Sequence, residues 1–334
     1  MSKLIKTSLA AGLVAFALGA NANVVTSIKP LGFIASAIAD NVTPVEIIVP
    51  AGASPHDYHL KPADVKKLKA ADIVLWIGED VDGFLEKTLE QFDEKKQLEI
   101  ADFDEIKPFL GKAEHHHHDH EEDHHAHKHE HHHDHKHEHG HKHEHSHKHE
   151  HKHEHEEHSH DELSTNWHVW YSPEISQVVA GKLAEKLTAV YPDKKSLIAQ
   201  NLAEFNRTLA EKSEKIKAQL APLKDKGFYV FHDAYGYFND AYGLKQTGAF
   251  TINPLVAPGA KTLATIKEEI EEHKVSCLFA EPQFTPKVIE TLAKGTGVHI
   301  GRLDPMGDKV QLGKTAYTDF LQFTADSYGE CLSK

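Results

Sequence analysis

Short apolar, β-branched runs alternate with helical patterns along most of this 334-residue chain. The first such runs cover residues 24–29, 45–49 and 73–77, and proline or glycine residues bound them. Residues 63–71 fit an intervening helix, with Pro62 in its first turn and Val65 and Leu68 on one face. Strands that alternate with helices favour a mostly parallel sheet covered by helices on both faces. We therefore predict an α/β fold.

The same alternation restarts near residue 227. We expect strands at 227–231, 249–252, 275–280 and 298–303, and helices at 262–273 and 286–295. Two helical segments precede them, at 173–190 and from 193 to about 220. The second segment would be about 40 Å long at ~1.5 Å per residue. A helix of that length could join two α/β lobes.

A histidine-rich stretch, residues 114–162, interrupts the first lobe. Of the 31 histidines in the chain, 25 lie between His115 and His160. The stretch has almost no apolar residue, so it cannot bury a core, and we expect disorder without metal. We predict accessory low-affinity metal sites in this loop, 115–160. The match to H-E-x-x-H at His120–His124 is expected by chance in such a composition and lacks the ordered helix that a protease site needs.

The net charge of −14 argues against nucleic-acid binding, which requires a basic surface. The N-terminus instead resembles an export signal. Lys3 and Lys6 precede the apolar run Leu9–Leu18, and Ala20-Asn21-Ala22 fits a cleavage site, so residues 1–22 are predicted to be a cleaved signal peptide. Cys277 and Cys331 are the only cysteines. In an oxidising compartment they suggest one disulfide, and two free thiols are the alternative.

Three isolated histidines occupy comparable places. His56 follows the run that ends at Val49, His232 follows the run 227–231, and His168 precedes the helix start at Ser172-Pro173. Ligands of open α/β sheets bind beyond the carboxyl ends of the strands. We therefore predict a cleft between the lobes that these imidazoles line, although a structural role for each histidine remains the alternative.

Three neutral nitrogen ligands suit Zn²⁺, whereas manganese or magnesium would call for more carboxylates. The fourth ligand could be water or Glu281, which follows the predicted strand 275–280. His59 is a reserve ligand because it lies close to His56. His273 and His299 are given structural roles. Imidazole must be neutral to bind metal, so affinity should fall as the pH drops through about 6.5.

Several longer phrases of this sequence resemble the periplasmic, Znu-type zinc-uptake solute-binding proteins of ABC transporters. The matching segments are Gly52–Tyr58, Trp167–Glu174, Phe231–Phe238, Phe279–Phe284 and Leu303–Gly307. The resemblance covers nearly the whole chain after the signal, and the phrase around His232 is highly specific. It implies two lobes with mostly parallel sheets, a long rigid helix between them, and metal in the interlobe cleft.

By this resemblance His56, His168 and His232 are the primary zinc ligands. Manganese-type members of the family carry an aspartate a few residues beyond the position of Glu281, where this chain has Phe284 and Thr285. No carboxylate is therefore carried over, and Glu281 is expected either to support a ligand from behind or to be a ligand itself. The Cys277–Cys331 pair also resembles the zinc-type members.

These observations predict a signal peptide at 1–22, a first lobe at 23–172 that includes loop 114–162, a helical segment at 173–226 and a second lobe at 227–334. The resemblance implies a monomeric periplasmic protein, not an enzyme, that captures Zn²⁺ and delivers it to an ABC transporter permease. A periplasmic metal store or chaperone without a transporter is an alternative. A zinc hydrolase is another, because three ligands plus water is also a catalytic arrangement.

Overall fold

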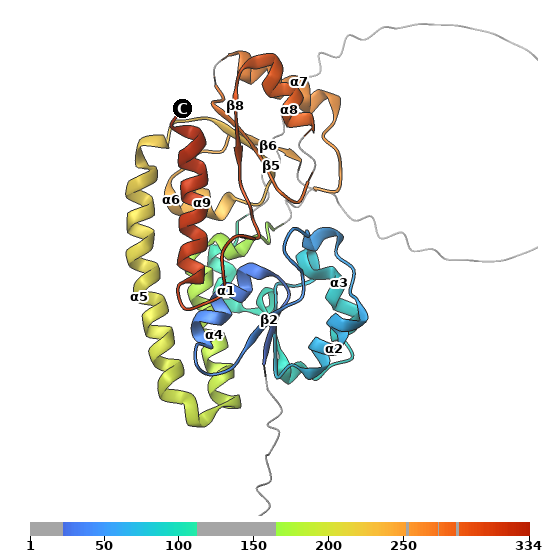
Figure 1. The fold of residues 1–334 in the computed structure, drawn as a ribbon, viewed down its shortest axis with the longest axis vertical. Coiled ribbons are helices and arrows are strands. Elements are labelled where there is room, and N and C mark those ends of the chain that lie inside the picture. Colours follow the sequence, from blue (N-terminus) through green and yellow to red (C-terminus); the bar gives the residue numbers. More distant parts are fainter. Residues whose placement is uncertain (1–22, 112–164, 252–253, 273, 285–286) are drawn as a thin grey trace, which may run out of the picture. The chain divides into compact units, whose positions relative to one another are not determined.

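Two four-stranded parallel sheets form the framework of the protein (Figure 1). The computed structural model describes residues 23–111, 165–251, 254–272, 274–284 and 287–334. The first sheet has the order β2-β1-β3-β4, and the second has the order β6-β5-β7-β8. Their strands are β1 Val24–Thr26, β2 Val45–Ile47, β3 Ile73–Trp76, β4 Gln97–Glu99, β5 Phe228–His232, β6 Gly248–Thr251, β7 Cys277–Ala280 and β8 His299–Arg302. All neighbouring strands pair in parallel, as predicted.

The described helices include the five that were predicted and four that were not. They are α1 Lys29–Ile38, α2 Pro62–Ala70, α3 Glu79–Leu89, α4 Pro173–Val190, α5 Lys195–Leu220, α6 Gly236–Tyr242, α7 Ala260–Glu271, α8 Lys287–Thr296 and α9 Ala316–Leu332. Short 3-10 turns at Pro55–Asp57 and Val169–Tyr171 hold two of the predicted ligand segments. The predicted start of α4 is confirmed, because Ser172 Oγ accepts a hydrogen bond from the Ile175 amide at 3.1 Å.

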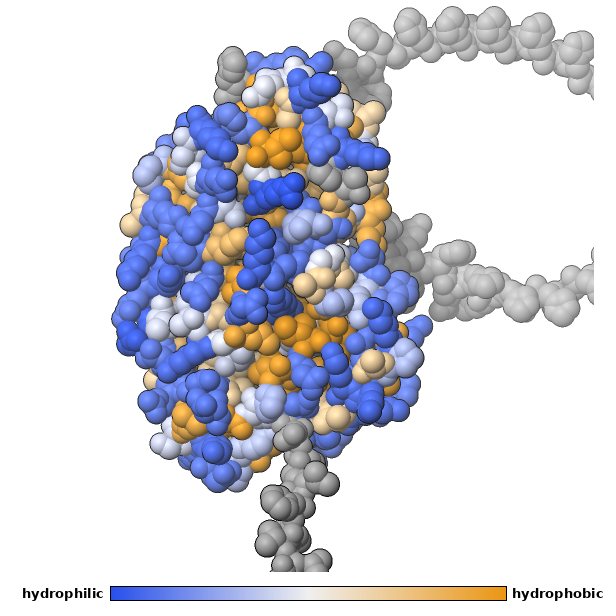
Figure 2. Space-filling view, viewed as in Figure 1, coloured by the Kyte–Doolittle hydropathy of each residue, from blue (hydrophilic) through white to orange (hydrophobic). Residues whose placement is uncertain are grey.

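The long helix is also confirmed. Helix α5 has 26 residues, and it connects the part of the chain that forms the first sheet to the part that forms the second. Its buried face carries Phe205, Leu209 and Ile216. Its opposite face gives the hydrophilic surface along α5 in Figure 2. Helix α5 packs against α1, α4, α6 and α9.

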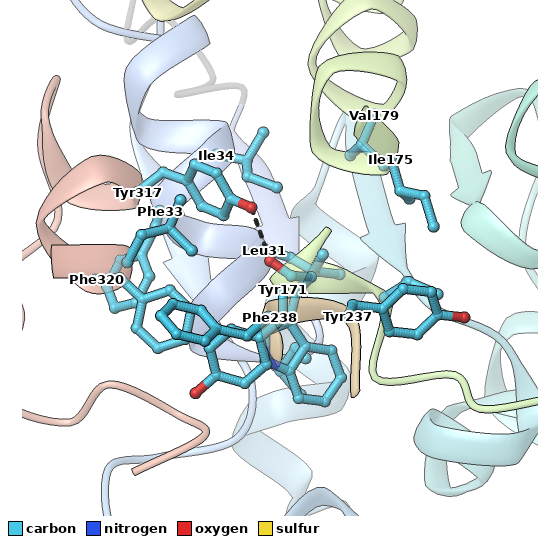
Figure 3. Packing of buried hydrophobic residues seen from close by; sticks show 14 of the residues in the cluster. Leu31, Phe33, Ile34, Tyr171, Ile175, Val179, Tyr237, Phe238, Tyr317 and Phe320 are labelled. Carbon is cyan, nitrogen blue, oxygen red and sulfur yellow. Dashed lines mark hydrogen bonds between the residues drawn. The ribbon is translucent and has the colours of Figure 1, made fainter. Parts of the chain in front are cut away.

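A single hydrophobic cluster reaches both sheets. It contains Val24 and Ile73 from the first sheet, and Phe228 and Phe279 from the second. Aromatic rings fill the space between the helices, and the Tyr171 and Phe320 rings stack with their centroids 5.0 Å apart (Figure 3). Because the protein interior is close-packed, such a shared core resists independent motion of the two sheets.

Some expectations fall outside the described residues, namely the signal peptide 1–22, the loop 114–162 and His273. Within the described part of the chain, no helix is both long and apolar enough to cross a membrane.

Candidate metal centre

The structure brings the three predicted histidines together from three separate elements. His56 lies in the 3-10 turn that follows β2, His168 immediately precedes the turn Val169–Tyr171, and His232 is the last residue of β5. Ser54 Oγ accepts a hydrogen bond from the His56 amide at 3.3 Å and so caps that turn. Each residue offers one ligand atom, and these atoms all lie within 4.8 Å of one another.

The spacing of the ring nitrogens matches a tetrahedral zinc ion. Nε2 of His168 lies 3.4 Å from Nε2 of His56 and 3.3 Å from Nε2 of His232. Nitrogens that ligate zinc at about 2.0–2.1 Å in tetrahedral geometry stand about 3.3–3.4 Å apart. The three nitrogens could therefore occupy three corners of one coordination sphere.

Hydrogen bonds on the far side of two rings fix which nitrogen carries the proton. Nδ1 of His168 lies 2.8 Å from Oδ1 of Asn166, and the Asn166 amide group donates to the Asp233 carbonyl at 2.9 Å. Nδ1 of His232 lies 2.8 Å from both carboxylate oxygens of Glu281. Both Nδ1 atoms therefore carry hydrogen, and the Nε2 atoms of His168 and His232 face each other with lone pairs.

Burial favours the neutral form of His56 and His168. It lowers the pKa of His56 to about 4, and the neighbouring His232 lowers it further as a lesser cause. The pKa of His168 is well below the ordinary value, again mainly through burial. The neutral form is the one that binds metal.

The remaining wall of the site is largely apolar. A cavity of about 10 Å³ is lined by the three histidines together with Ser54, Pro55, Trp170, Gln283, Phe284, Pro305 and Met306. None of these described lining residues is a carboxylate. Phe284 occupies the region where the resemblance leads one to look for an aspartate, and its ring packs on the His232 ring with centroids 6.1 Å apart. This nitrogen-rich, apolar donor set fits Zn²⁺ better than Mn²⁺.

Comparison with known proteins identifies the family. The family model described as zinc-uptake complex component A, periplasmic (ZnuA), matches residues 24–331. This chain belongs to the ZnuA family. The relatives named high-affinity zinc uptake system protein ZnuA include one from Haemophilus influenzae, 72% identical over 337 residues with 100% of both chains covered. Another, from Yersinia pestis, is 42% identical over 313 residues and covers 94% of this chain and 92% of its own length.

Solved structures with less than a quarter sequence identity share the ZnuA-type fold. A ZnuA deletion mutant with zinc bound has a TM-score of 0.69 at 21% identity, with 94% of this chain and 98% of that chain covered. The periplasmic zinc-binding protein TroA from Treponema pallidum has a TM-score of 0.70 at 17% identity, with 94% and 100% covered. The family resemblance and the fold class predicted from sequence are thus confirmed.

The other predicted residues of this ZnuA-family chain take different places. His59 is exposed, and its Nδ1 lies 2.9 Å from the Asp57 carbonyl rather than among the three histidines. His299 is exposed on β8. Glu281 is buried behind His232 and is not among the residues that line the cavity. The predicted disulfide between Cys277 and Cys331 is present, with Cα atoms 6.2 Å apart.

Sequence analysis missed Asn166. Its Oδ1 also accepts a hydrogen bond from the His168 amide at 3.0 Å. An asparagine side chain that bonds the backbone two residues later is a recognised turn pattern, so the spacing Asn166-Trp167-His168 was the available signal.

Proposed function

We propose that this protein captures Zn²⁺ in the periplasm through His56, His168 and His232 and delivers it to the permease of an ABC transporter. Zinc is the cargo of the site. The two facing Nε2 lone pairs of His168 and His232, 3.3 Å apart, carry this proposal. Two neutral acceptors repel each other unless a cation lies between them, and a metal ion also engages the nearby Nε2 of His56.

The hydrogen bonds that Asn166 and Glu281 accept from the ligand rings support the same role. In this proposal Glu281 acts on zinc through His232, and Asn166 acts through His168, because each fixes a ring and raises its basicity. The fourth ligand is then a water molecule, for which a cavity of about 10 Å³ offers space for about one small molecule. His59 stays a reserve ligand, and the loop 115–160 supplies weaker accessory sites.

The wider assignment rests on family membership. Proteins of this family are described as a periplasmic zinc-uptake component. We infer that residues 1–22 are a signal peptide removed on export, and that the lobes are 23–172 and 227–334 with the helical segment 173–226 between them. We also infer that the mature protein is a monomer, is not an enzyme and does not bind nucleic acid.

Zinc titration of a variant that lacks residues 114–162 tests the proposal. We expect one tight site per molecule to remain, and His232→Ala in that background to abolish tight binding. His299→Ala is the matched control, because it removes an exposed histidine far in sequence from the three. Loss of the tight site on deletion of the loop alone would refute the three-histidine site.

The two alternative functions, a metal store and a zinc hydrolase, can each be separated from zinc uptake by experiment. A metal store or chaperone would bind zinc equally well but would not need a permease, so zinc-limited growth after loss of the gene separates it from an uptake protein. A zinc hydrolase would turn over ester or peptide substrates. We expect none, because no described residue that lines the cavity is an acid, and both oxygens of the buried Glu281 contact His232.

A further inference from the structure

The segment Asp304–Asp308, between β8 and α9, forms a fixed turn that we call the crossing segment. The Asp304 carboxylate accepts hydrogen bonds from the Met306 amide at 3.1 Å and the Asp308 amide at 2.8 Å. Gly307 has a φ of 61°, and a Cβ atom there would lie 2.7 Å from the Phe320 ring and 2.9 Å from the Phe33 ring. The crossing segment is therefore held tightly between α1 and α9.

This segment contacts residues that lie near His56, His168 and Glu281 in the sequence. Trp170, two residues after His168, donates its indole N–H to the Pro305 carbonyl at 3.1 Å. Gln283, two residues after Glu281, donates to Asp304 at 2.9 Å. The Gly52 amide, at the start of the loop that carries His56, donates to Asp308 Oδ2 at 2.7 Å. Three chain segments that meet at the site are thus joined through one short turn.

The position of the His56 ring depends mainly on the loop that carries it, residues 52–57. Nδ1 of His168 and Nδ1 of His232 each have a side-chain acceptor, whereas no described residue accepts a hydrogen bond from Nδ1 of His56. His56 is also only half-buried, while the other two rings are buried. The position of this ring is therefore set by the backbone of residues 52–57 rather than by a partner behind it.

A second hydrogen bond joins Asp308 to the first lobe. Lys29, at the first turn of α1, donates its ammonium to the Asp308 carbonyl at 2.7 Å. Asp308 thus meets the first lobe at two points, with its side chain at Gly52 and with its backbone at Lys29. The hydrogen bond from Lys29 to the Asp308 carbonyl fixes the backbone of Asp308, and with it the position of the Asp308 carboxylate.

We propose that Asp308 is a positioning residue for zinc capture, because its carboxylate holds the Gly52–Asp57 loop, and with it His56, against the two buried histidines. This inference rests on the proposed function, since it concerns the same three-histidine site. Partners that hydrogen-bond a ligand directly change metal affinity by about 10–100-fold when removed, and we expect the lower end for Asp308, which acts through the loop. A carboxylate that accepts from a backbone N–H is also a stronger acceptor than a neutral group.

The experiment compares Asp308→Ala, Asp308→Asn and Lys309→Ala in the variant that lacks residues 114–162. We expect Asp308→Ala to speed zinc dissociation about tenfold. Asp308→Asn should retain most of the affinity, because the amide oxygen can still accept from Gly52. Lys309→Ala, an exposed neighbour, should behave as the parent. If Asp308→Asn binds zinc as weakly as Asp308→Ala while the loop keeps its position, the residue acts through its charge, and the positioning role is wrong.

A double-mutant cycle separates positioning from general destabilisation. Once His56 is replaced by alanine, Asp308→Ala should change zinc affinity by less than about twofold, since there is no ring left to position. An equal effect of Asp308→Ala with and without His56 would overturn the proposal.

Hydrogen exchange without zinc gives a readout that does not depend on the proposed function. Amides of residues 52–57 should exchange faster in Asp308→Ala than in Asp308→Asn or the parent. Faster exchange combined with no tight zinc site in the parent would refute the proposed function but leave the loop contact intact. Unchanged exchange with a tight zinc site in the parent would refute the role of Asp308 alone.

Discussion

Asn166 and Glu281 lie behind two of the three imidazoles, and they decide which ring nitrogen is free for metal. Each accepts a hydrogen bond from an Nδ1 atom at 2.8 Å. A ring that lost this partner could rotate or adopt the other tautomer, and the lone pair would then no longer point at the ion.

We therefore expect Asn166→Ala to weaken zinc binding by about 10–100-fold. Asn166→Asp should bind more tightly than Asn166→Ala, because a carboxylate oxygen still accepts from His168. Competition against a chelator of known affinity measures the difference. Gln219→Ala on the exposed face of α5 serves as the amide control. Equal affinities for Asn166→Ala and the control would remove Asn166 from the site.

The lowered pKa values of His56 and His168 change the expected acid dependence of zinc binding. Ordinary imidazoles would lose affinity as the pH falls through about 6.5. Burial lowers the pKa of His56 to about 4 and that of His168 well below its usual value. A lowered pKa means that protons compete with zinc for these two rings only at lower pH. From pH 7.5 to pH 5.5 affinity should fall less steeply than for three ordinary histidines, and it should drop sharply towards pH 4. Titrations across this range check this, and a steep loss centred at pH 6.5 would contradict it.

Sequence analysis singled out the three proposed ligands and Glu281, whereas Asn166 and Asp308 were not found from sequence. His56 and His232 lie where strands end, and the parallel-sheet rule places such residues at one edge. Asn166 and Asp308 matter through contacts with residues that sequence analysis had no means of placing beside them. Asp308 meets Gly52 across 256 positions of sequence.

At the scale of elements, most strands and helices were predicted within a few residues. The boundaries of α4 agree in full at 173–190, where Ser172 and Pro173 give strong start signals. Helix α1 was missed because it begins at Lys29, inside the run assigned to a strand. Helix α9 was not predicted either. Its buried residues, from Ala316 to Leu332, lie on one side, and the exposed Asp319, Asp326 and Glu330 lie on the other, so its helical spacing was an available signal.

The disulfide joins the end of α9 to β7, and we expect it to stabilise the second lobe. It closes 54 residues, and the chain-entropy model gives about 4 kcal/mol for a loop of that size. Replacing both Cys277 and Cys331 by alanine should lower the free energy of urea unfolding by up to that amount. The fully reduced parent protein is the matched comparison. A double variant as stable as the oxidised parent would mean that the bond adds nothing to the fold.

Asp82, in the first turn of α3, makes stability depend on pH. Its carboxyl group is buried, which raises its pKa to about 7, although Oδ2 accepts from the Ile77 amide at 2.7 Å. The folded protein therefore binds a proton that the unfolded chain, with a pKa of 3.8, binds more weakly. This contribution is fully present below pH 3.8 and is lost as the pH rises through about 7.

We thus expect Asp82→Asn to reduce the loss of stability between pH 5 and pH 8, because the amide cannot ionise. Thermal unfolding at several pH values measures this, with Asp80→Asn as an exposed control on the same turn. Parallel stability curves for the parent and Asp82→Asn would show that Asp82 does not titrate in this range.

At the scale of the molecule, the two-lobed plan was predictable because the β-then-α pattern occurs twice. The extent to which the two lobes share helices could not be predicted. The crossing segment packs between Phe33 of α1 and Phe320 of α9, and α9 ends at the disulfide to β7. Helix α9 therefore contacts the first lobe near its start and the second lobe at its end, in parallel with α5 (Figure 1).

Two helices that link the same lobes restrict hinge motion more than one would. Opening the site by rotation would have to bend both α5 and α9 or break the shared hydrophobic cluster, and packed cores do not deform continuously. We therefore expect zinc to enter by local movement of the His56 loop, the least buried part of the site.

The radius of gyration from small-angle scattering should stay constant on zinc addition in the variant without residues 114–162. His232→Ala in the same background controls for nonspecific metal effects. A zinc-dependent compaction in the parent and not in His232→Ala would show that the lobes close as rigid bodies, and the two-helix connection would then be a hinge.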